Sequence, residues 1–501
     1  MAGRKKDSVI LSWEGKRNIL PGAQSGSVKK IKTSEIVFPA GKTQTEGTFR
    51  PRILNRLIHG DNLDAISSLL NEGYGEKAAL IYIDPPFASN ADYYRKITVG
   101  GSKKTFTLKR LSFKDRYKKG DYLTMLYPRL MLMKRLLKED GLIFVHCDWR
   151  INSHLRLILD EVFGEENFLN EIAWNYGGRG AKIISRQFPR NHDIIYVYGR
   201  TKKARLKKIC IEKKMPVKEA RAFGYKLDGK GRVFKTAPRG DYSDASIKKF
   251  RKEGRIYETR NGNIRIKYFL ERTGGMVMDK KIVGDVWDDI PDSMHSPLKE
   301  RTDYKTQKPE LLLKRIIESA TGEGDLVCDF FSGSGTTGVV AEKLKRRWLL
   351  CEINRSGIDT ARARLIREGG SVFSIEKING SGGENRPAAL TLKRPEVRNI
   401  SGKKAEVTVA IKNYRAPKDR ALENMSKKDF PLLLDYWTID WNHDGKVFKG
   451  QWHSLRGNGK KAATVKKEAK AVLDKGKRRI AVRAVDIFGN ETEKIIELVC
   501  G

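Results

Sequence analysis

Three glycines in the second half of the chain have the spacing of a nucleotide-binding turn. Gly333, Gly335 and Gly338 form a Gly-x-Gly-x-x-Gly pattern between a predicted strand and a predicted helix. Glycines there let a nucleotide-like ligand approach the backbone at the helix N-terminus. Glu352 lies 19 residues after Gly333, at the end of the next predicted strand, where a carboxylate can accept hydrogen bonds from ribose hydroxyls. The pattern favours a nucleotide cofactor over a plain tight turn, and leaves open a nicotinamide dinucleotide or S-adenosylmethionine.

A second motif, Asp84-Pro85-Pro86-Phe87, follows the apolar run 79–83. It lies at the carboxyl end of a predicted buried strand, which is the ligand-binding edge of a parallel sheet. The exocyclic amine of a nucleobase is a poor nucleophile because its lone pair is delocalised into the ring. The Asp84 carboxylate and the rigid Pro85 carbonyl can accept both N–H bonds, so that the lone pair turns toward a methyl donor. The Phe87 ring can stack on a base drawn out of the duplex.

Composition points to a polyanionic partner and away from metal chemistry. The chain has 501 residues, with 100 Lys or Arg and 61 Asp or Glu, a net charge of +39. Such an excess predicts nucleic acid first and an anionic membrane second. No apolar run is long enough for a spanning helix, and residues 1–20 do not form a signal peptide. The five cysteines form no CxxC pair, and His146 and Cys147 point to opposite faces of a predicted strand, so we expect a cytoplasmic, metal-free protein.

Hydrophobic patterning divides the chain into five parts. Strands and helices alternate over residues 51–199 and again over 283–372, which predicts one doubly wound α/β sheet assembled from both stretches. The interruption, 200–282, holds 26 Lys or Arg and 9 Asp or Glu, and indicates an inserted basic module. Residues 1–50 are polar and basic, and we expect an arm with little structure. Residues 373–501 are expected to form a small β-sandwich.

Two finer expectations concern the connecting segments. Residues 88–120 are basic and are expected to form a mobile loop after the Asp-Pro-Pro-Phe motif. In the last part, strands are expected at 407–411, 436–441, 480–485 and 494–499.

The two motifs together resemble those of the amino-methylating DNA methyltransferases, which act on adenine N6 or cytosine N4. The catalytic motif precedes the cofactor motif, with a basic insertion between them. That order is similar to the permuted β group, which includes the modification subunits of type III restriction systems. Residues 137–145, 163–168 and 306–310 are also similar to family segments, and the resemblance covers about residues 55–370. It implies a class I methyltransferase sheet in permuted order, S-adenosylmethionine as cofactor, and target recognition by residues 200–282.

The resemblance also implies a role for each motif residue. Asp84 and Pro85, held by Pro86, would orient the amine, and Phe87 would stack on the flipped base. Relatives often have Tyr at the position of Phe87, a change that preserves stacking. The remaining implied residues concern the cofactor: Thr306 and Lys308 at its methionine carboxylate, Asp61 near its adenine end, and Asp329, Phe331, Gly333, Ser334, Gly335 and Glu352 as its main cradle.

The expected function is site-specific methylation of adenine N6 in double-stranded DNA, in the cytoplasm at the nucleoid. An Asp before Pro-Pro, as in Asp84, is the commoner form among the adenine enzymes. Cytosine N4 methylation is the nearest alternative. A nicotinamide-dependent oxidoreductase would leave the Asp-Pro-Pro-Phe motif and the charge unexplained, and the intact motifs argue against a catalytically dead DNA-binding scaffold. The resemblance leaves open a restriction subunit, or a second copy of the chain, as a protein partner.

Overall fold

The computed structural model describes residues 11–16, 28–39, 54–100, 105–177, 188–380, 388–417, 427–457 and 464–501. The chain divides into two compact units. Met1–Lys207 and Asp285–Gly501 make up the first unit, and Lys208–Gly284 makes up the second.

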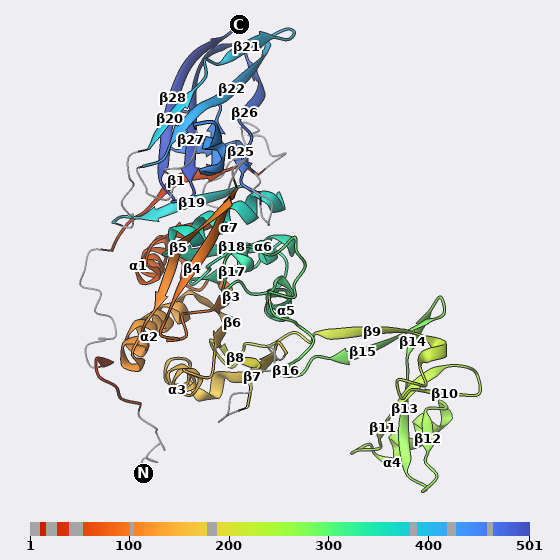
Figure 1. Ribbon diagram of the computed structural model, residues 1–501. Coiled ribbons are helices and arrows are strands. Elements are labelled where there is room, and N and C mark those ends of the chain that lie inside the picture. The colour runs from red at the N-terminus through yellow and green to blue at the C-terminus, as the bar shows by residue number, and fades with distance from the viewer. Residues whose placement is uncertain are drawn as a thin grey trace. The chain divides into compact units, whose positions relative to one another are not determined.

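A mixed sheet, eleven-stranded within the described residues, forms the centre of the first unit (Figure 1). In spatial order its strands are β16 (Val286–Trp287), β7 (Phe168–Asn175), β8 (His192–Gly199), β6 (Leu137–Cys147), β3 (Ala78–Ile83), β17 (Leu326–Asp329), β18 (Arg347–Glu352), β2 (Asn55–His59), β19 (Phe373–Ile378), β1 (Ile31–Val37) and β24 (Phe448–Gly450). The six strands from β6 to β19 run parallel to one another. β8 runs antiparallel to its neighbours β6 and β7.

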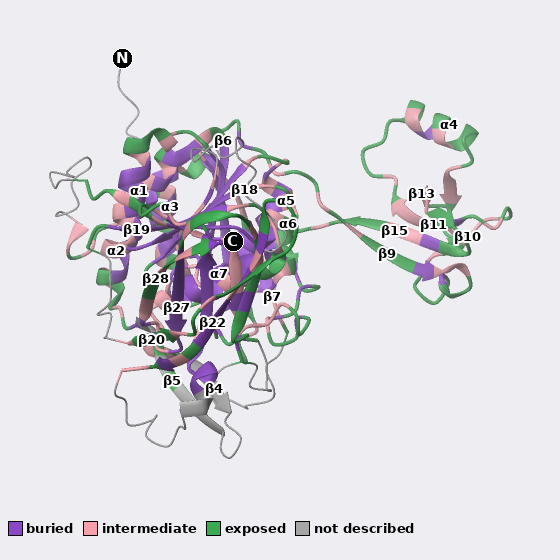
Figure 2. Ribbon diagram, turned by 90° about the horizontal axis from the view of Figure 1, so that it is seen from above, coloured by how far each residue is buried: buried purple, intermediate pink, exposed green. Residues whose placement is uncertain are grey.

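Helices cover both faces of this sheet, and its central strands are buried (Figure 2). The helices α1 (Asn62–Leu69), α2 (Lys119–Leu136) and α3 (Asn152–Phe163) form one core with residues that include Leu349 of β18. Leu350 points the other way, toward α6 (Thr336–Lys343), which packs against α5 (Glu310–Ala320) and α7 (Arg355–Glu368). The doubly wound α/β sheet, built from both sides of the insertion, is therefore confirmed. No helix in the described ranges is both long and apolar enough to cross a bilayer.

Two segments that were expected to lack regular structure contain strands. Within residues 1–50, β1 pairs with β19 on one side and β24 on the other. Its buried Glu35 is neutralised by arginines far along the chain, which a local pattern does not reveal. Within residues 88–120, β4 (Ala91–Gly100) and β5 (Thr105–Asp115) form an antiparallel hairpin. The two strands satisfy each other's backbone groups, so a basic composition does not prevent the hairpin.

The last part of the chain forms two facing β-sheets. One contains β20 (Ala389–Leu392), β21 (Glu396–Asn399), β22 (Lys404–Arg415) and β26 (Glu468–Asp474), and the other β23 (Leu434–Asp440), β25 (Trp452–Leu455), β27 (Gly476–Asp486) and β28 (Glu491–Cys500). Apolar side chains of β22, β26, β23 and β27 share one core. The expected β-sandwich is confirmed, and the four expected strands correspond to β22, β23, β27 and β28. Its expected start at residue 373 is wrong, because β19 and β24 pair with strands of the central sheet.

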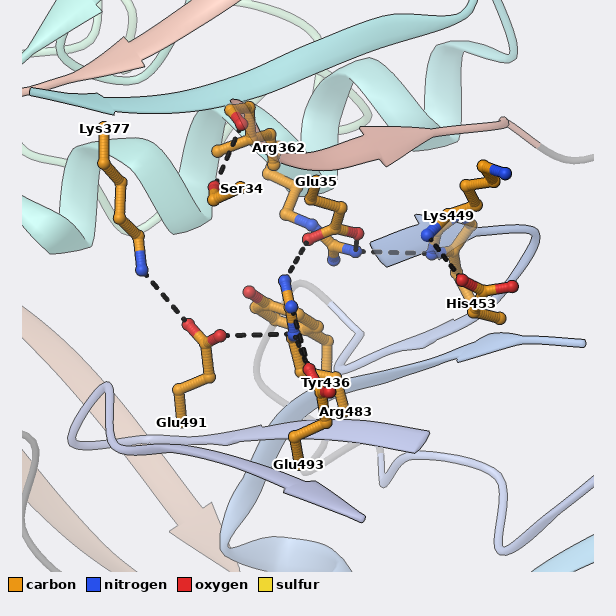
Figure 3. A network of polar contacts seen from close by, with 12 residues as sticks. Ser34, Glu35, Arg362, Lys377, Tyr436, Lys449, His453, Arg483, Glu491 and Glu493 are labelled. Carbon is orange, nitrogen blue, oxygen red and sulfur yellow. Dashed lines mark hydrogen bonds and ion pairs between the residues drawn. The ribbon is translucent and has the colours of Figure 1, made fainter. Parts of the chain in front are cut away.

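A buried ionic network joins this β-sandwich to the central sheet (Figure 3). Glu35 of β1 accepts a hydrogen bond from Arg362 of α7 at 2.7 Å and lies 3.4 Å from Arg483 of β27. Glu491 of β28 lies 3.2 Å from both Arg355 and Arg483. Together with the β1–β24 pairing, these contacts make the β-sandwich an integral part of the first unit.

The second unit is small and mainly β. β9 (Cys210–Pro216) pairs with β15 (Met276–Ile282), which also pairs with β14 (Glu271–Thr273). A separate sheet contains β10 (Lys226–Leu227), β11 (Val233–Pro238), β13 (Ile264–Phe269) and β12 (Ile256–Glu258), and the helix α4 spans Asp244–Lys252. Its buried apolar cluster consists of Met215, Ala220, Val233 and Val277, so few residues stabilise it compared with the central sheet.

Candidate active site

The two sequence motifs lie next to each other at the carboxyl edge of the central sheet. β3 ends directly before Asp84, and its parallel neighbour β17 ends at Asp329. A pocket of about 310 Å³ opens at this edge. It is lined by every residue that the sequence singled out except Gly335 and Gly338, namely Asp61, Asp84, Pro85, Pro86, Phe87, Thr306, Lys308, Asp329, Phe331, Gly333, Ser334 and Glu352.

The glycine turn and Glu352 form one wall of the pocket. Gly333 has a left-handed φ of 50°, and its N–H donates to Glu352 Oε2 at 2.8 Å. A side chain at Gly333 would crowd the ring of Tyr304, with a Cβ only 3.3 Å from it. Burial raises the pKa of Glu352, and the N–H groups of Asn354 and Gly333 oppose that rise by donating to the carboxylate. This wall therefore offers a fixed acceptor and a backbone surface that a ligand can approach closely.

Gly335 has a different reason for being glycine. It caps α6 with a φ of 76°, and a Cβ there would lie 2.6 Å from Cβ of Ala361 in α7. A Cβ on Gly338 would lie 2.6 Å from Leu350 of β18. These two glycines therefore permit close packing of α6 against α7 and the sheet, while Gly333 faces the pocket.

Asp329 joins the turn to α6 from below the pocket. Its carboxylate accepts hydrogen bonds from Phe331 N at 2.9 Å and from Thr337 Oγ1 at 2.5 Å. Burial raises the pKa of Asp329 to about 7, although these two hydrogen bonds act in the opposite direction. The side chain is therefore partly protonated near neutral pH and holds the shape of the turn.

Asp84 is held on one side only. Its Oδ2 accepts a hydrogen bond from Lys308 Nζ in a partly buried ion pair. Its Oδ1 is buried and has no hydrogen-bond partner among the described residues. The sequence assigned Lys308 to the cofactor, whereas the structure pairs its ammonium group with the Asp84 carboxylate. One oxygen of Asp84, a residue that lines the pocket, is therefore left without a hydrogen-bond partner among the described residues.

Asp115 holds the loop that carries Phe87. Its Oδ2 accepts hydrogen bonds from Phe87 N at 3.1 Å, Ser89 N at 2.9 Å and Ser89 Oγ at 2.6 Å. Ala88 and Asn90 of this loop have φ values of 53° and 55°, a region that non-glycine residues rarely adopt. The buried carboxylate thus stabilises an unfavourable backbone next to the Asp-Pro-Pro-Phe motif.

Asp61 has two structural partners at the rim of the pocket. It caps α1 by accepting from Leu63 N at 2.8 Å, and it pairs with Arg129 Nη2 of α2 at 2.8 Å. Thr306, in the segment before α5, also lines the pocket. The residues assigned to the two ends of the cofactor are thus both present at the pocket.

The sequence analysis did not identify Asp115 or His146 as parts of the site. Asp115 lies in a segment that was predicted to be a loop, so no pattern marked it. His146 is completely buried on β6, and its ring centre lies 5.8 Å from that of Phe87. The alternation of β6 was a usable signal, because it turns His146 away from Cys147, which belongs to the core formed with α1, α2 and α3.

Comparison with known proteins identifies the family. The model of the N6/N4 DNA methylase family matches residues 78–363. The type II methyltransferase M.EcaI of Enterobacter cloacae is 30% identical over 374 residues, which cover 69% of this chain and 73% of that protein. The type III restriction-modification enzyme StyLTI Mod subunit of Salmonella typhimurium is 28% identical over 355 residues, 60% of this chain and 53% of that subunit, so the chain matches about half of its length. Among solved structures, the cytosine-N4-specific PvuII DNA methyltransferase is 15% identical, with 62% of this chain and 86% of that chain covered and a TM-score of 0.37. With more than half of its residues matched by the family model, the chain belongs to the N6/N4 DNA methylase family.

Proposed function

We propose that this chain transfers a methyl group from S-adenosylmethionine to the N6 amine of adenine in double-stranded DNA, after the base has been flipped into the pocket. One observation carries the proposal. Asp84 presents a buried oxygen without a hydrogen-bond partner among the described residues, in the same pocket as the Gly333 turn and Glu352. An acceptor for an amine and a cradle for a nucleoside cofactor are thus adjacent.

Asp84 and Pro85 act on the amine. Oδ1 of Asp84 accepts one N–H bond, and the Pro85 carbonyl, which proline geometry holds rigid, accepts the second. The nitrogen lone pair is then released from the ring and directed at the methyl donor. Lys308 fixes the other oxygen of Asp84, so the acceptor is oriented before the base arrives.

Phe87 stacks on the flipped base. Its backbone is anchored by Asp115, and its ring is bordered by His146 and by the ammonium group of Lys308, 5.4 Å from the ring centre. An aromatic face in this position holds any nucleobase, because every base has a π-face. Stacking therefore retains the base in the pocket, and the contacts to its amine determine which atom reacts.

The pocket residues fit S-adenosylmethionine, which supplies an electrophilic methyl group when bound. Glu352 accepts from ribose hydroxyls, and the left-handed Gly333 lets the ligand approach the backbone. Thr306 and Lys308 hold the carboxylate of the methionine part. Lys308 then contacts this carboxylate in place of part of its contact with Asp84. Asp61, already held by Arg129, lies toward the adenine part.

Adenine is favoured over cytosine because Asp, and not Ser, precedes Pro-Pro in this chain. Cytosine N4 methylation uses the same acceptors and is the second candidate. A nicotinamide-dependent oxidoreductase would have no use for an amine acceptor beside the turn.

The second unit, Lys208–Gly284, is proposed to read the target sequence. It holds 21 Lys or Arg and 9 Asp or Glu, and basic groups lie over aromatic rings, such as Arg232 over Phe269 at 4.0 Å. This mixture suits contact with phosphates and bases. Exchange of the unit for that of a relative with a different target should change the methylated motif; an unchanged motif from a folded exchange would refute this role.

Modification-sensitive sequencing tests the proposed activity in cells. DNA from bacteria that express the chain should carry N6-methyladenine at one short motif, and DNA from bacteria that express Asp84→Ala should not. A restriction subunit or a second copy of the chain is compatible with the proposal, and neither is required for this readout.

A further inference from the structure

His146 lies between two carboxylates behind the pocket. Its side chain is fully buried on β6. On one side Nδ1 lies 4.0 Å from Oδ1 of Asp84 and 3.1 Å from the hydroxyl of Tyr82. On the other side Nε2 lies 3.2 Å from Oδ2 of Asp193 on β8. The amine-activating mechanism above uses neither His146 nor Asp193.

The partners determine which ring nitrogen carries the proton. Burial raises the pKa of Asp193, but the hydrogen bond and charge of His146, together with Lys308, outweigh this and lower it overall, so the carboxylate is ionised. An ionised carboxylate only accepts, so Nε2–H of His146 donates to it. Burial and the charge of Asp84 raise the pKa of Tyr82 well above its ordinary value, so its hydroxyl stays protonated and donates to Nδ1. In the neutral ring Nδ1 is therefore an acceptor that faces Asp84.

Methylation of an amine must release a proton. As the nitrogen lone pair forms the N–C bond, the bond between the methyl carbon and the sulfonium sulfur breaks and its electron pair stays on sulfur. One of the two N–H protons then has to leave the nitrogen. Oδ1 of Asp84 accepts that N–H, and Oδ2 is already paired with Lys308, so the proton needs a further acceptor to leave the site. A flipped base also covers the pocket, so water has little access.

We propose that His146 and Asp193 form a proton exit behind Asp84. The inference rests on the proposed function. The proton moves from the amine to Oδ1 of Asp84 and then to Nδ1 of His146, whose lone pair is freed when the Tyr82 hydroxyl turns its hydrogen away. A small rotation of the carboxylate or one bridging water closes the gap between Oδ1 and Nδ1. The imidazolium is stabilised by Asp193, as in other Asp–His pairs that serve a buried acid–base group. Asp193 has 15% of its side chain exposed, and it provides the route to solvent.

The side chains that surround the proton exit can be named, so the other groups that could change charge there are known. Two aromatic rings, Phe87 and Trp174, flank the imidazole at 5.8 and 5.6 Å. The titratable or charged groups that face His146 or its two carboxylates within the described residues are Tyr82, Asp84, Tyr122, Cys147, Asp148, Tyr176, Asp193, Tyr304, Lys308 and Asp329. Histidine is the side chain that ordinarily changes charge between pH 5 and 8. Burial raises the pKa of Asp329, which also faces Asp84, to about 7, so a rate limb between pH 5 and 8 is assigned to His146 only when the His146 variant loses it.

The test measures single-turnover methyl transfer between pH 5.5 and 8.5. In the unaltered protein the rate should fall toward low pH, because a protonated His146 cannot accept. His146→Gln and Asp193→Asn should each lower the plateau rate about tenfold to a hundredfold and remove that limb. The double variant should be no slower than the worse single one, since both belong to one path. His154→Gln, a histidine on α3 outside the pocket, is the matched control and should change neither rate nor profile.

Three further readouts separate the possible outcomes. S-adenosylmethionine affinity by calorimetry and the melting temperature should be unchanged in both variants. Normal rates in the variants, or reduced rates with the acid limb intact, would overturn the proton exit while the proposed function stands. If His146→Gln does not fold, Asp193→Asn alone must lose the limb. An unaltered protein without any methyl transfer would instead refute the proposed function, and the proton exit with it.

Discussion

Replacement of Asp84 by Ala should abolish most methyl transfer and leave cofactor binding nearly intact. In the proposed mechanism Asp84 supplies one of the two acceptors that shape the nucleophile, and loss of one such preorganised contact typically costs about 10²–10³ in rate. That loss corresponds to about 2.7–4 kcal/mol of transition-state stabilisation. Gly333, in the turn after β17, and Glu352, at the end of β18, form the wall proposed to hold the cofactor and should be unaffected.

The ion pair with Lys308 adds a cost in stability. The two side chains are 16% and 14% exposed, so removal of the carboxylate leaves a largely buried ammonium group. Breaking a fully buried pair costs about 3–5 kcal/mol, and the partial exposure of this pair puts Asp84→Ala at the lower end of that range. Asp84→Asn preserves the size of the side chain and one acceptor oxygen, and should unfold less readily than Asp84→Ala. The freed Lys308 remains available to an anionic ligand, so cofactor affinity should hold or rise.

The assay pairs calorimetry of S-adenosylmethionine binding with single-turnover methyl incorporation into DNA. Asp325→Ala is the matched control, since Asp325 pairs with Lys138 at 2.6 Å near the amino end of β17, on the edge of the sheet opposite the pocket. It should retain normal turnover. Near-normal turnover by Asp84→Ala, or a cofactor affinity that falls as steeply as the rate, would refute the assignment of the active site.

Three other variants probe the stacking ring, the domain junction and the buried acid. Phe87→Ala should weaken retention of the flipped base by about 1–3 kcal/mol, and Phe87→Tyr should not. Fluorescence of 2-aminopurine at the target position measures this retention, and equal losses in the two variants would contradict stacking. Arg483→Met should lower the free energy of unfolding by about 3 kcal/mol in urea titrations, because buried Glu35 loses one of two cations; no change would mean that the junction contributes little. Burial raises the pKa of Asp329 from 3.8 in the unfolded chain to about 7 in the folded protein. The protonated side chain therefore stabilises the folded protein fully below pH 4, and this contribution to the free energy of unfolding is lost as pH rises through 7. Relative to Asp329→Asn, the unaltered protein should therefore lose up to roughly 4 kcal/mol between pH 4 and 8, and parallel pH profiles would contradict this.

Much of the fold was predictable because buried parallel strands have unbroken apolar sequences. The run 78–83 is buried at every position, since helices cover both faces of β3. Its end at Asp84 and the glycine turn after β17 mark the same edge of the sheet. The apolar run that ends at Asp84 and the glycine turn therefore predicted where the pocket lies. Nearly all of the residues that were predicted to line it do so.

Contacts between distant residues were not predictable in the same way. The strand β1 is polar, and Glu35 becomes acceptable in the interior only through Arg362 and Arg483, which follow it by more than 300 positions. Lys308 was assigned to the cofactor, although 224 positions separate it from its observed partner, Asp84. Such pairings depend on three-dimensional proximity that no sequence period encodes.

The supporting residues of the site were missed for a related reason. Asp115 and His146 occur in no recognisable motif, and each acts through another residue. Asp115 stabilises backbone at Phe87 and Ser89, and His146 reaches Asp84 only across the faces of two adjacent strands. A motif identifies groups that touch a ligand more readily than groups that hold them in place.

The central claim is amine methylation of adenine, and analysis of modified nucleosides tests it most directly. The purified chain is incubated with unmethylated plasmid DNA and S-adenosylmethionine that carries a deuterated methyl group, and the DNA is digested to nucleosides for mass spectrometry. The account predicts deuterated N6-methyldeoxyadenosine with the unaltered chain and none with Asp84→Ala. Label in N4-methyldeoxycytidine would contradict the assignment to adenine, and the absence of label from every nucleoside would contradict the proposed activity.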